Sequence, residues 1–582
     1  MDMAISNLSD TETPFLEEAA TATAATEVVV DGCVDYRGLP VSRSSSGGWR
    51  SARYIISVEV AERFVYYGIE SNLITYLTGP LGQSTVVAAE NVNVWSGTAM
   101  MLPLVGAFVA DSFLGRYRTI IAASVIYVLG LGLLTLSALI PPLCSSSDCE
   151  NTNNKTLCSS NYMVQVVLFY FSLYLVAIGQ GGHKPCAQAF GADQFDGQYP
   201  EECRARSSFF NWWYFGSCAG AIFTVTVLSY IQDNLSWGLG FGIPCIFMVA
   251  ALVVFLLGTK TYRYSSKRDD RSALVRIGRV FVAAVRNWRT PPPAVALEEE
   301  TRGGTLPHQS VEQFKFLSRA LLAPEGSKES EDMCSISEVE EAKACLSLVP
   351  IWVTSLMYAI VFSQPPTFFT KQGATMDRSV TPGLNVPAAS LQSLIGITTV
   401  LTIPIYDRVF VPITRAFTRK PAGITVLQRI GIGMFLSALS MVSAALVETR
   451  RLKTAVEYGL VDKPNMTIPM SIRWLIPQYA LFGVADVFTM VGLQEFFYNQ
   501  VPTELKSVGL SLYLSIFGVG SFLSGFLIST VDKATRGDGR DSWFANNLNH
   551  GHLDYFYWLL AGLSAIELVA YLYFTKSYIY NK

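Results

Sequence analysis

The sequence has few charged residues and lacks the patterns of an enzyme site. Only 15% of its 582 residues are Asp, Glu, Lys or Arg, against about 25% in a soluble domain, and 50% are hydrophobic. Its ten cysteines form no CxxC pair and no metal-ligand spacing with the four histidines. A nucleophile elbow and a Walker phosphate loop are also absent. We therefore expect a membrane protein with many spans that is not an enzyme, has no cofactor or metal, and does not bind nucleic acid.

The first apolar run, Ile55 to Leu77, is long enough to cross a bilayer but carries charges near its middle. At 100° per residue, Glu59, Glu62, Arg63 and Tyr66 share one face of the helix. A charge at the bilayer centre costs roughly 2.5–3.5 kcal/mol on insertion scales, so such residues normally face a bundle interior or a water-filled cavity. This face is either a structural ion pair between helices or a proton and substrate site.

Apolar runs predict about twelve spans in two halves. A disordered cytosolic tail is expected over 1–50, a first bundle over 51–259, a cytosolic linker over 260–342, a second bundle over 343–577 and a cytosolic C-terminus over 578–582. The linker is polar and begins with many Lys and Arg, which the positive-inside rule places in the cytosol. The expected spans cover 55–77, 94–109, 119–140, 164–178, 208–231, 239–258, 345–363, 388–409, 424–447, 474–496, 507–531 and 555–574.

Two loops at corresponding places of the halves indicate a weak internal repeat. The first, GAFVADSFLGRYR, contains Asp111, Arg116 and Arg118; the second, IPIYDRVFVPITRAFTRK, contains Asp407 and Arg408. Each combines an acid and a base in a short connection between helices. We expect these residues to act as latches that gate the two bundles.

Two further charges lie in expected spans. Lys184 follows a glycine-rich stretch in GQGGHKPCAQAFGADQFD, where small residues allow helices to approach closely. Glu495, in GLQEFFYNQVP, is either an interfacial anchor at a helix end or an acid that faces the first-half charges across a cavity.

Taken together, EVAERFVYYG, ADSFLGRYR, GQGGHKPCAQAFGADQFD and QEFFYNQVP resemble the proton-coupled oligopeptide transporters, and within them the plant nitrate and peptide transporter family. The resemblance implies an all-α membrane protein with the major facilitator superfamily fold, twelve helices in two six-helix bundles, and alternating access. It assigns proton coupling to Glu59, Glu62, Arg63 and Lys184. The expected substrate-binding residues are Arg63, Tyr66, Tyr67, Lys184, Phe362 and Glu495.

Phe362 departs from the family's best-known nitrate carrier, in which a histidine on the seventh helix is associated with nitrate binding. An aromatic ring cannot donate a hydrogen bond to nitrate, whereas Arg63 and Lys184 can still attract an anion. The expected function is proton-coupled symport of a small anionic solute, such as nitrate, a peptide or a plant hormone or specialised metabolite. A proton-independent facilitator or channel-like uniporter is the alternative, and the partners in either case are the solute and the lipid bilayer, with protons for the symporter.

Location rests on a weaker pattern. TETPFLEE, from Thr11 to Glu18, resembles the acidic dileucine sorting signals of plant vacuolar membrane proteins, although a random tail sequence explains it equally well. We expect the vacuolar membrane rather than the plasma membrane. Cys144, Cys149 and Cys158 share one polar loop, and the sequence leaves open whether they form a disulfide.

Overall fold

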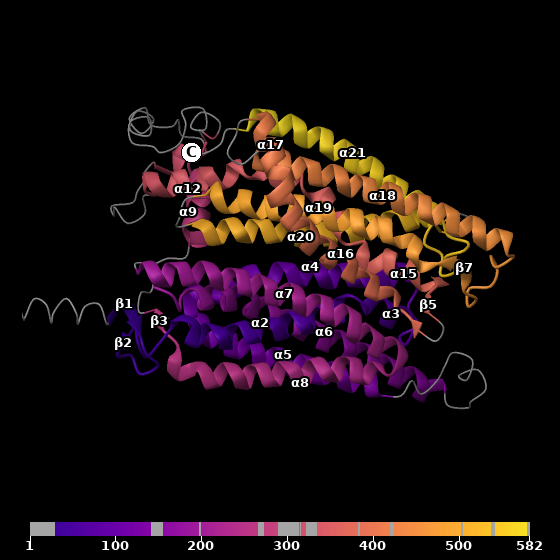
Figure 1. The fold of residues 1–582 in the computed structure, drawn as a ribbon, viewed down its shortest axis with the longest axis horizontal. Helices are drawn as coiled ribbons and strands as arrows, with labels where there is room; N and C mark the ends of the chain where they lie inside the picture. Colours follow the sequence, from indigo (N-terminus) through magenta and orange to yellow (C-terminus); the bar gives the residue numbers. More distant parts are fainter. Residues whose placement is uncertain are drawn as a thin grey trace, which may run out of the picture.

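The computed structural model describes residues 29–140, 155–196, 199–265, 273–288, 314, 316–321, 334–381, 384–418, 424–501, 505–536 and 542–578. Its long helices form two bundles, drawn one above the other in Figure 1. The first bundle contains α2 (Gly48–Glu70), α3 (Leu73–Thr78), α4 (Thr85–Val109), α5 (Arg116–Leu139), α6 (Lys155–Ala192), α7 (Pro200–Asn234) and α8 (Trp237–Leu257). The second contains α12 (Ile336–Ser347), α13 (Val349–Val353), α14 (Leu356–Phe362), α15 (Thr370–Ala374), α16 (Ser393–Ile405), α17 (Val411–Thr418), α18 (Val426–Glu457), α19 (Ile476–Asn499), α20 (Lys506–Thr535) and α21 (Leu553–Ser577).

The spans agree with the predicted number. Within the described ranges, nine helices are long and apolar enough to cross a membrane, and the bent pair Ile336–Val353 and Leu356–Ala374 makes a tenth. The other two long helices are α2, which carries the charged face, and α7. Several helices extend beyond their expected spans because hydropathy marks only the part in the lipid. The 32-residue α18, for example, is about 48 Å long at 1.5 Å per residue, against a hydrocarbon core of about 30 Å.

The bundle has two different ends. At the linker end, α8 is followed by the 3-10 turn η2 (Gly258–Thr261). At the same end, α9 (Ala273–Arg286) and η3 (Leu317–Leu321) pack on α12 (Figure 1). Their contact is a small apolar cluster that includes Val280, Leu317 and Val339. The linker therefore has a core of its own, which its polar composition did not predict. The far end carries the short strands β4 (Met376–Asp377), β5 (Ser379–Thr381), β6 (Leu384–Asn385) and β7 (Ile468–Ser471), and the 3-10 turns η6 (Ala388–Gln392) and η8 (Ile472–Leu475).

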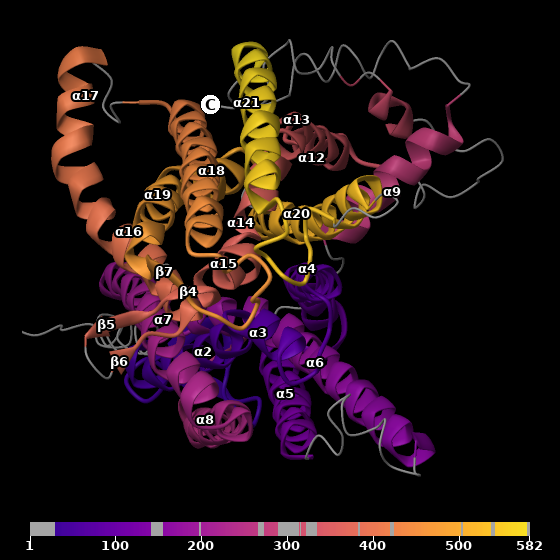
Figure 2. The same cartoon turned by 90° about the vertical axis from the view of Figure 1, so that its right-hand side faces the viewer.

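Polar contacts between the two halves gather at the far end. Seen from that end, α3 and α15 lie side by side between the bundles (Figure 2). Lys371 donates to Thr78 over 3.1 Å, and Arg378 pairs with Asp233 at 3.6 Å. Farther along, α4 packs directly on α20, where Gly97 faces Gly518.

Part of the N-terminal tail is folded, contrary to the expectation of disorder over 1–50. Strand β1 (Val29–Val34) pairs with β2 (Pro40–Ser42) and with β3 (Tyr264–Ser265), which directly follows the last helix of the first half. Helix α2 begins at Gly48. Ser and Gly in this segment suggested a flexible tail, but its backbone is satisfied by strand pairing with a distant part of the chain.

Both latch loops contain the same local distortion. A π-helical turn, η1 (Ala110–Leu114), ends α4, and another, η7 (Tyr406–Phe410), follows α16. Each begins one residue before an aspartate, which supports the internal repeat read from the sequence. The loops then differ, because the first turns at Gly115, where φ is +79°, whereas the second continues as α17.

Candidate functional site

The charged face of α2 points into the first bundle, as its helical spacing predicted. Arg63 Nε lies 2.8 Å from Glu59 Oε1 and 3.5 Å from Glu62 Oε2. The side chains of both acids are buried, at 1% and 0% exposure, while that of Arg63 is 16% exposed. One guanidinium therefore serves two buried carboxylates.

The hydrogen bonds of this cluster are incomplete. Among the described residues, neither oxygen of Glu62 accepts a hydrogen bond, and Oε2 of Glu59 is also without a partner. Tyr127 of α5 and His183 of α6 also have buried polar atoms without a hydrogen-bond partner in the described part of the chain. Since buried polar groups are normally satisfied, the gathering of these atoms around Arg63 marks the cluster as a candidate functional site.

Lys184 reaches the same region from α6. Its Nζ lies 3.8 Å from the Sδ of Met100 and 5.6 Å from the centre of the Tyr66 ring. It forms no ion pair with a carboxylate in the described part of the chain. Close helix packing places it there: a Cβ on Gly181 would lie 2.6 Å from Leu102, and one on Gly106 would lie 2.1 Å from the carbonyl oxygen of Gly181.

Tyr66 and Tyr67 follow the charged triad along α2. The ring of Tyr66 stacks on Trp95 with centroids 5.8 Å apart, and Trp95 donates to the carbonyl of Leu173 over 3.0 Å. Tyr67 packs edge-on against Tyr66 at 5.4 Å. The predicted pair is thus held rigidly beside Arg63 and Lys184.

Glu70 belongs to the same face but was missed from the sequence. It accepts a hydrogen bond from Tyr66 over 2.7 Å and one from Ser96 over 2.6 Å, both at Oε1. The helical spacing that selected positions 59, 62, 63 and 66 continues to position 70, so the pattern could have found it. Glu70 extends the charged face toward the boundary between the halves.

Phe362 forms the opposing surface in the second half. Its ring lies 5.0 Å from that of Phe517 and 6.2 Å from that of Phe482. Together with Glu70 and Met100, Phe362 and Phe517 line a small pocket between the bundles. The predicted aromatic residue on the seventh span is therefore brought close to the charged face.

Glu495 takes a different partner. The Glu495 side chain is 43% exposed and lies 3.5 Å from Arg429. The guanidinium of Arg429 lies 4.4 Å from the centre of the Tyr406 ring. This ion pair is internal to the second half. Of the two interpretations left open by the sequence, an anchor at the helix end fits this conformation better.

The predicted latches are only partly described. Arg116 forms an ion pair at 2.5 Å with Asp193, which lies just after α6. The sequence analysis did not single out Asp193. Arg118 and Arg408 are exposed. The side chains of Asp111 and Asp407, as well as Cys144, Cys149 and the segment TETPFLEE, lie outside the described residues.

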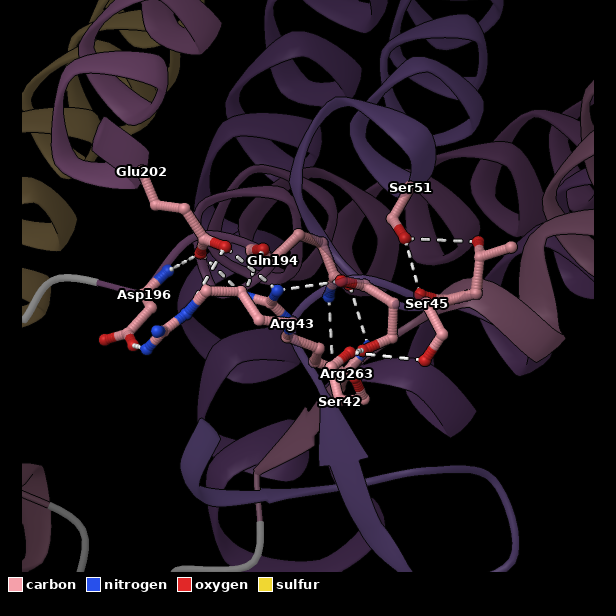
Figure 3. Close-up of polar contacts among 10 residues, drawn as sticks. Ser42, Arg43, Ser45, Ser51, Gln194, Asp196, Glu202 and Arg263 are labelled. Atoms are coloured by element: carbon pink, nitrogen blue, oxygen red, sulfur yellow. Dashed lines mark hydrogen bonds and ion pairs between the residues drawn. The ribbon is translucent and has the colours of Figure 1, made fainter. Parts of the chain in front are cut away.

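A second charged cluster, at the linker end, was not predicted (Figure 3). Arg263, almost fully buried, donates to Glu202 over 2.7 and 3.0 Å and to the carbonyl of Ser46 over 2.7 Å. Arg43 joins it by pairing with Asp196 at 2.6 Å. This cluster joins the folded tail to the first bundle, and its ion pairs between distant segments indicate a structural role.

Comparison with known proteins agrees with this architecture. The model of the POT family, PTR2, matches residues 117–544. The chain is 66% identical over 546 residues to Protein NRT1/PTR FAMILY 5.10 of Arabidopsis thaliana, covering 94% of this chain and 96% of the relative. It is 57% identical over 561 residues to Protein NRT1/PTR FAMILY 5.14 of the same plant, covering 96% and 98%.

Solved structures confirm the expected fold, which is shared with POT family transporters. An auto-inhibited POT family peptide transporter matches with a TM-score of 0.66 at 22% identity, covering 91% of this chain and 97% of that one. The POT family transporter PepTSo matches with the same TM-score and identity, covering 91% and 98%. The protein is a multi-pass integral membrane transporter that belongs to the POT family, among its NRT1/PTR members.

Proposed function

We propose that the protein is a proton-coupled symporter in which Glu59, Glu62, Arg63 and Lys184 link proton binding to solute binding. The observation that carries this proposal is that two buried carboxylates compete for Arg63, at 2.8 and 3.5 Å. When both acids are ionised, the triad has a net negative charge in a medium where uncompensated charge is costly. Uptake of one proton balances it.

Protonation also changes what the cations can do. With one acid neutral, Arg63 needs only one carboxylate partner and can turn toward an anionic group of the solute. Lys184 has no carboxylate partner in the described chain and provides a second positive charge. Its Nζ lies 5.6 Å from the centre of the Tyr66 ring. The solute is therefore proposed to be small and to carry an anionic group, as nitrate, peptides and many plant hormones or specialised metabolites do.

Movement of the solute requires the halves to separate at one end and close at the other. The far-end contacts suit such a gate because Arg378 and Lys371 are long side chains that can release Asp233 and Thr78 without breaking a helix. We take the linker end to be cytosolic, because the Lys and Arg residues at the start of the linker fit the positive-inside rule. We further propose the vacuolar membrane as the site of action.

Proteoliposomes test the coupling directly. The full-length protein would be reconstituted and given nitrate, a dipeptide or an anionic plant metabolite, with or without an inward proton gradient. Accumulation that depends on the gradient and is abolished by a protonophore is expected, and it should be lost in Glu62→Gln. Asp462→Asn, a change of the same chemistry at a side chain that is 89% exposed, is the matched control.

Two results would contradict the proposal. Solute that equilibrates but never accumulates would indicate a facilitator, in which the charges serve binding alone. Gradient-driven uptake that survives Glu62→Gln would leave Glu59 and Arg63 as a structural ion pair.

A further inference from the structure

The pocket between the bundles has a chemistry of its own. It lies above the charged triad, where α2 and α4 of the first half meet α14, η5 (Pro365–Phe369) and α20 of the second. Its polar lining comes from both halves: Glu70, Asn93, Ser96, Ser363 and Ser521. None of the lining residues is basic. Glu70 is therefore the charged group of this pocket, and its charge is negative when ionised.

The carboxyl group of Glu70 is positioned to accept a hydrogen bond from a ligand. Tyr66 and Ser96 both donate to its Oε1, at 2.7 and 2.6 Å, which fixes the carboxyl group in place. Its Oε2 accepts no hydrogen bond from the described residues. A preorganised acceptor at a boundary between moving halves suits a ligand that carries N–H or O–H donors.

The other lining groups complete an acceptor set. Asn93 uses its NH₂ group to donate to Ser524 over 3.1 Å, which leaves its carbonyl oxygen as an acceptor. The hydroxyls of Ser363 and Ser521 are 3.2 Å apart. The rings of Phe362 and Phe517 flank the same space and pack against each other with their centroids 5.0 Å apart.

The small volume of the pocket limits the size of the group that it can bind. In this conformation the cavity offers about 10 Å³ to the centre of a water molecule, which is room for roughly one water. A primary ammonium group has about the bulk of a water and three donors, whereas a trimethylated ammonium group is far larger. A neutral water is the competing occupant.

We propose that this pocket is a subsite for the primary ammonium group of an organic solute, with Glu70 as its counter-ion. The inference deepens the proposed function, on which it rests, by adding a cationic requirement to the anionic one. Lys184 lies over the ring of Tyr66 and Glu70 lies at its hydroxyl, so the two opposite charges are held along one side chain. A solute with both an acidic and a primary amino group would match both, whereas nitrate would leave Glu70 unpaired.

Binding to the purified full-length protein in detergent tests the subsite without any proton gradient. The probes are phenethylamine, its N,N,N-trimethyl analogue and phenylacetate, which share a ring and differ in head group. Thermal stabilisation as a function of concentration gives the affinities. We expect phenethylamine to bind best and Glu70→Gln to weaken it by at least about tenfold, because a desolvated charge pair is lost. Asp462→Asn should leave the affinity unchanged.

The outcomes separate the two proposals. Equal binding of phenethylamine to Glu70→Gln and to the wild type, stronger binding of phenylacetate or of the trimethyl analogue, or no binding of the amine at millimolar concentration would each overturn the ammonium subsite. None of these results bears on gradient-driven uptake. Conversely, loss of proton coupling in the proteoliposome experiment would leave an amine-binding pocket intact.

Discussion

The two halves share a fold but treat their buried charges differently. In the first half, Glu59 and Glu62 share one arginine, and three of their four carboxylate oxygens accept no hydrogen bond from the described residues. In the second half, Arg451 binds both oxygens of Glu448, at 2.6 and 2.8 Å, and also donates to Asn549 over 2.7 Å. Both groups of that pair are completely buried. The Glu448–Arg451 pair is a closed structural contact, whereas the Glu59–Glu62–Arg63 cluster leaves its acids without a full set of partners among the described residues.

The same contrast extends to the acids near the seventh span. Glu567 of α21 accepts from the backbone N–H of Met357 over 2.7 Å, at the point where the span bends by 54°. Asp486 of α19 accepts from the hydroxyl of Tyr358. Glu567 thus satisfies a backbone N–H that the broken helix leaves free, and Asp486 is paired with a side-chain hydroxyl.

Breaking the satisfied pair should have the largest effect on stability. Arg451→Met leaves Glu448 buried without a counter-ion, which costs about 3–5 kcal/mol. The melting temperature of the protein in detergent should fall markedly. In the matched control Arg536→Met, the arginine paired with Asp532 is 68% exposed, so the change should be small. Equal shifts in both variants would refute the distinction between structural and exposed pairs.

Close packing in the first half gives the next effect. A Cβ on Gly106 would lie 2.1 Å from the carbonyl oxygen of Gly181, so Gly106→Ala must push α4 and α6 apart. Overpacking of this kind costs about 1–3 kcal/mol and would also move Lys184. Gly132→Ala, where the added carbon meets nothing within 4 Å, is the control. The melting temperatures of the two variants should differ clearly, and similar values would contradict the packing argument.

Removing the Glu567 carboxyl group, which accepts from the Met357 N–H at the break of the seventh span, should lower stability by an intermediate amount. Glu567→Leu removes the acceptor of the Met357 N–H and should cost about 1–3 kcal/mol. Glu567→Gln keeps an oxygen acceptor of the same length and should cost less. Melting temperatures of the two variants measure the difference. If Gln destabilised as much as Leu, the charge rather than the hydrogen bond would be the stabilising feature.

Helical spacing and hydropathy predicted the parts of this molecule that repeat along the chain. Most of the spans follow from apolar length, and the clustering of Glu59, Glu62 and Arg63 follows from 100° per residue. The partner of Glu495 could not be predicted in this way, because Arg429 lies on another helix and no local pattern joins the two.

Pairing between segments that are distant in the chain could also not be predicted from hydropathy or helical spacing. Strand β1 is ordered because it meets β3, more than two hundred residues later, and Arg263 is buried because Glu202 and Gln194 are brought to it by folding. Short strands and loops carry little periodicity, so their order depends on contacts that only the folded chain supplies. Glu70 differs from these cases, since its spacing was visible and only its partners were unknown.

The smallest effect should come from the gate between the halves. Arg378 is 37% exposed and lies 3.6 Å from Asp233, so Arg378→Ala should cost only about 0.2–1 kcal/mol, equivalent to a change of roughly 1.4–5-fold in opening of the far end. Hydrogen exchange of α3 and α15 should accelerate by that factor in the purified protein. The matched control is again Asp462→Asn, at an exposed loop of the same end. Exchange that stays unchanged in Arg378→Ala would show that the Arg378–Asp233 contact does not help to hold the far end closed.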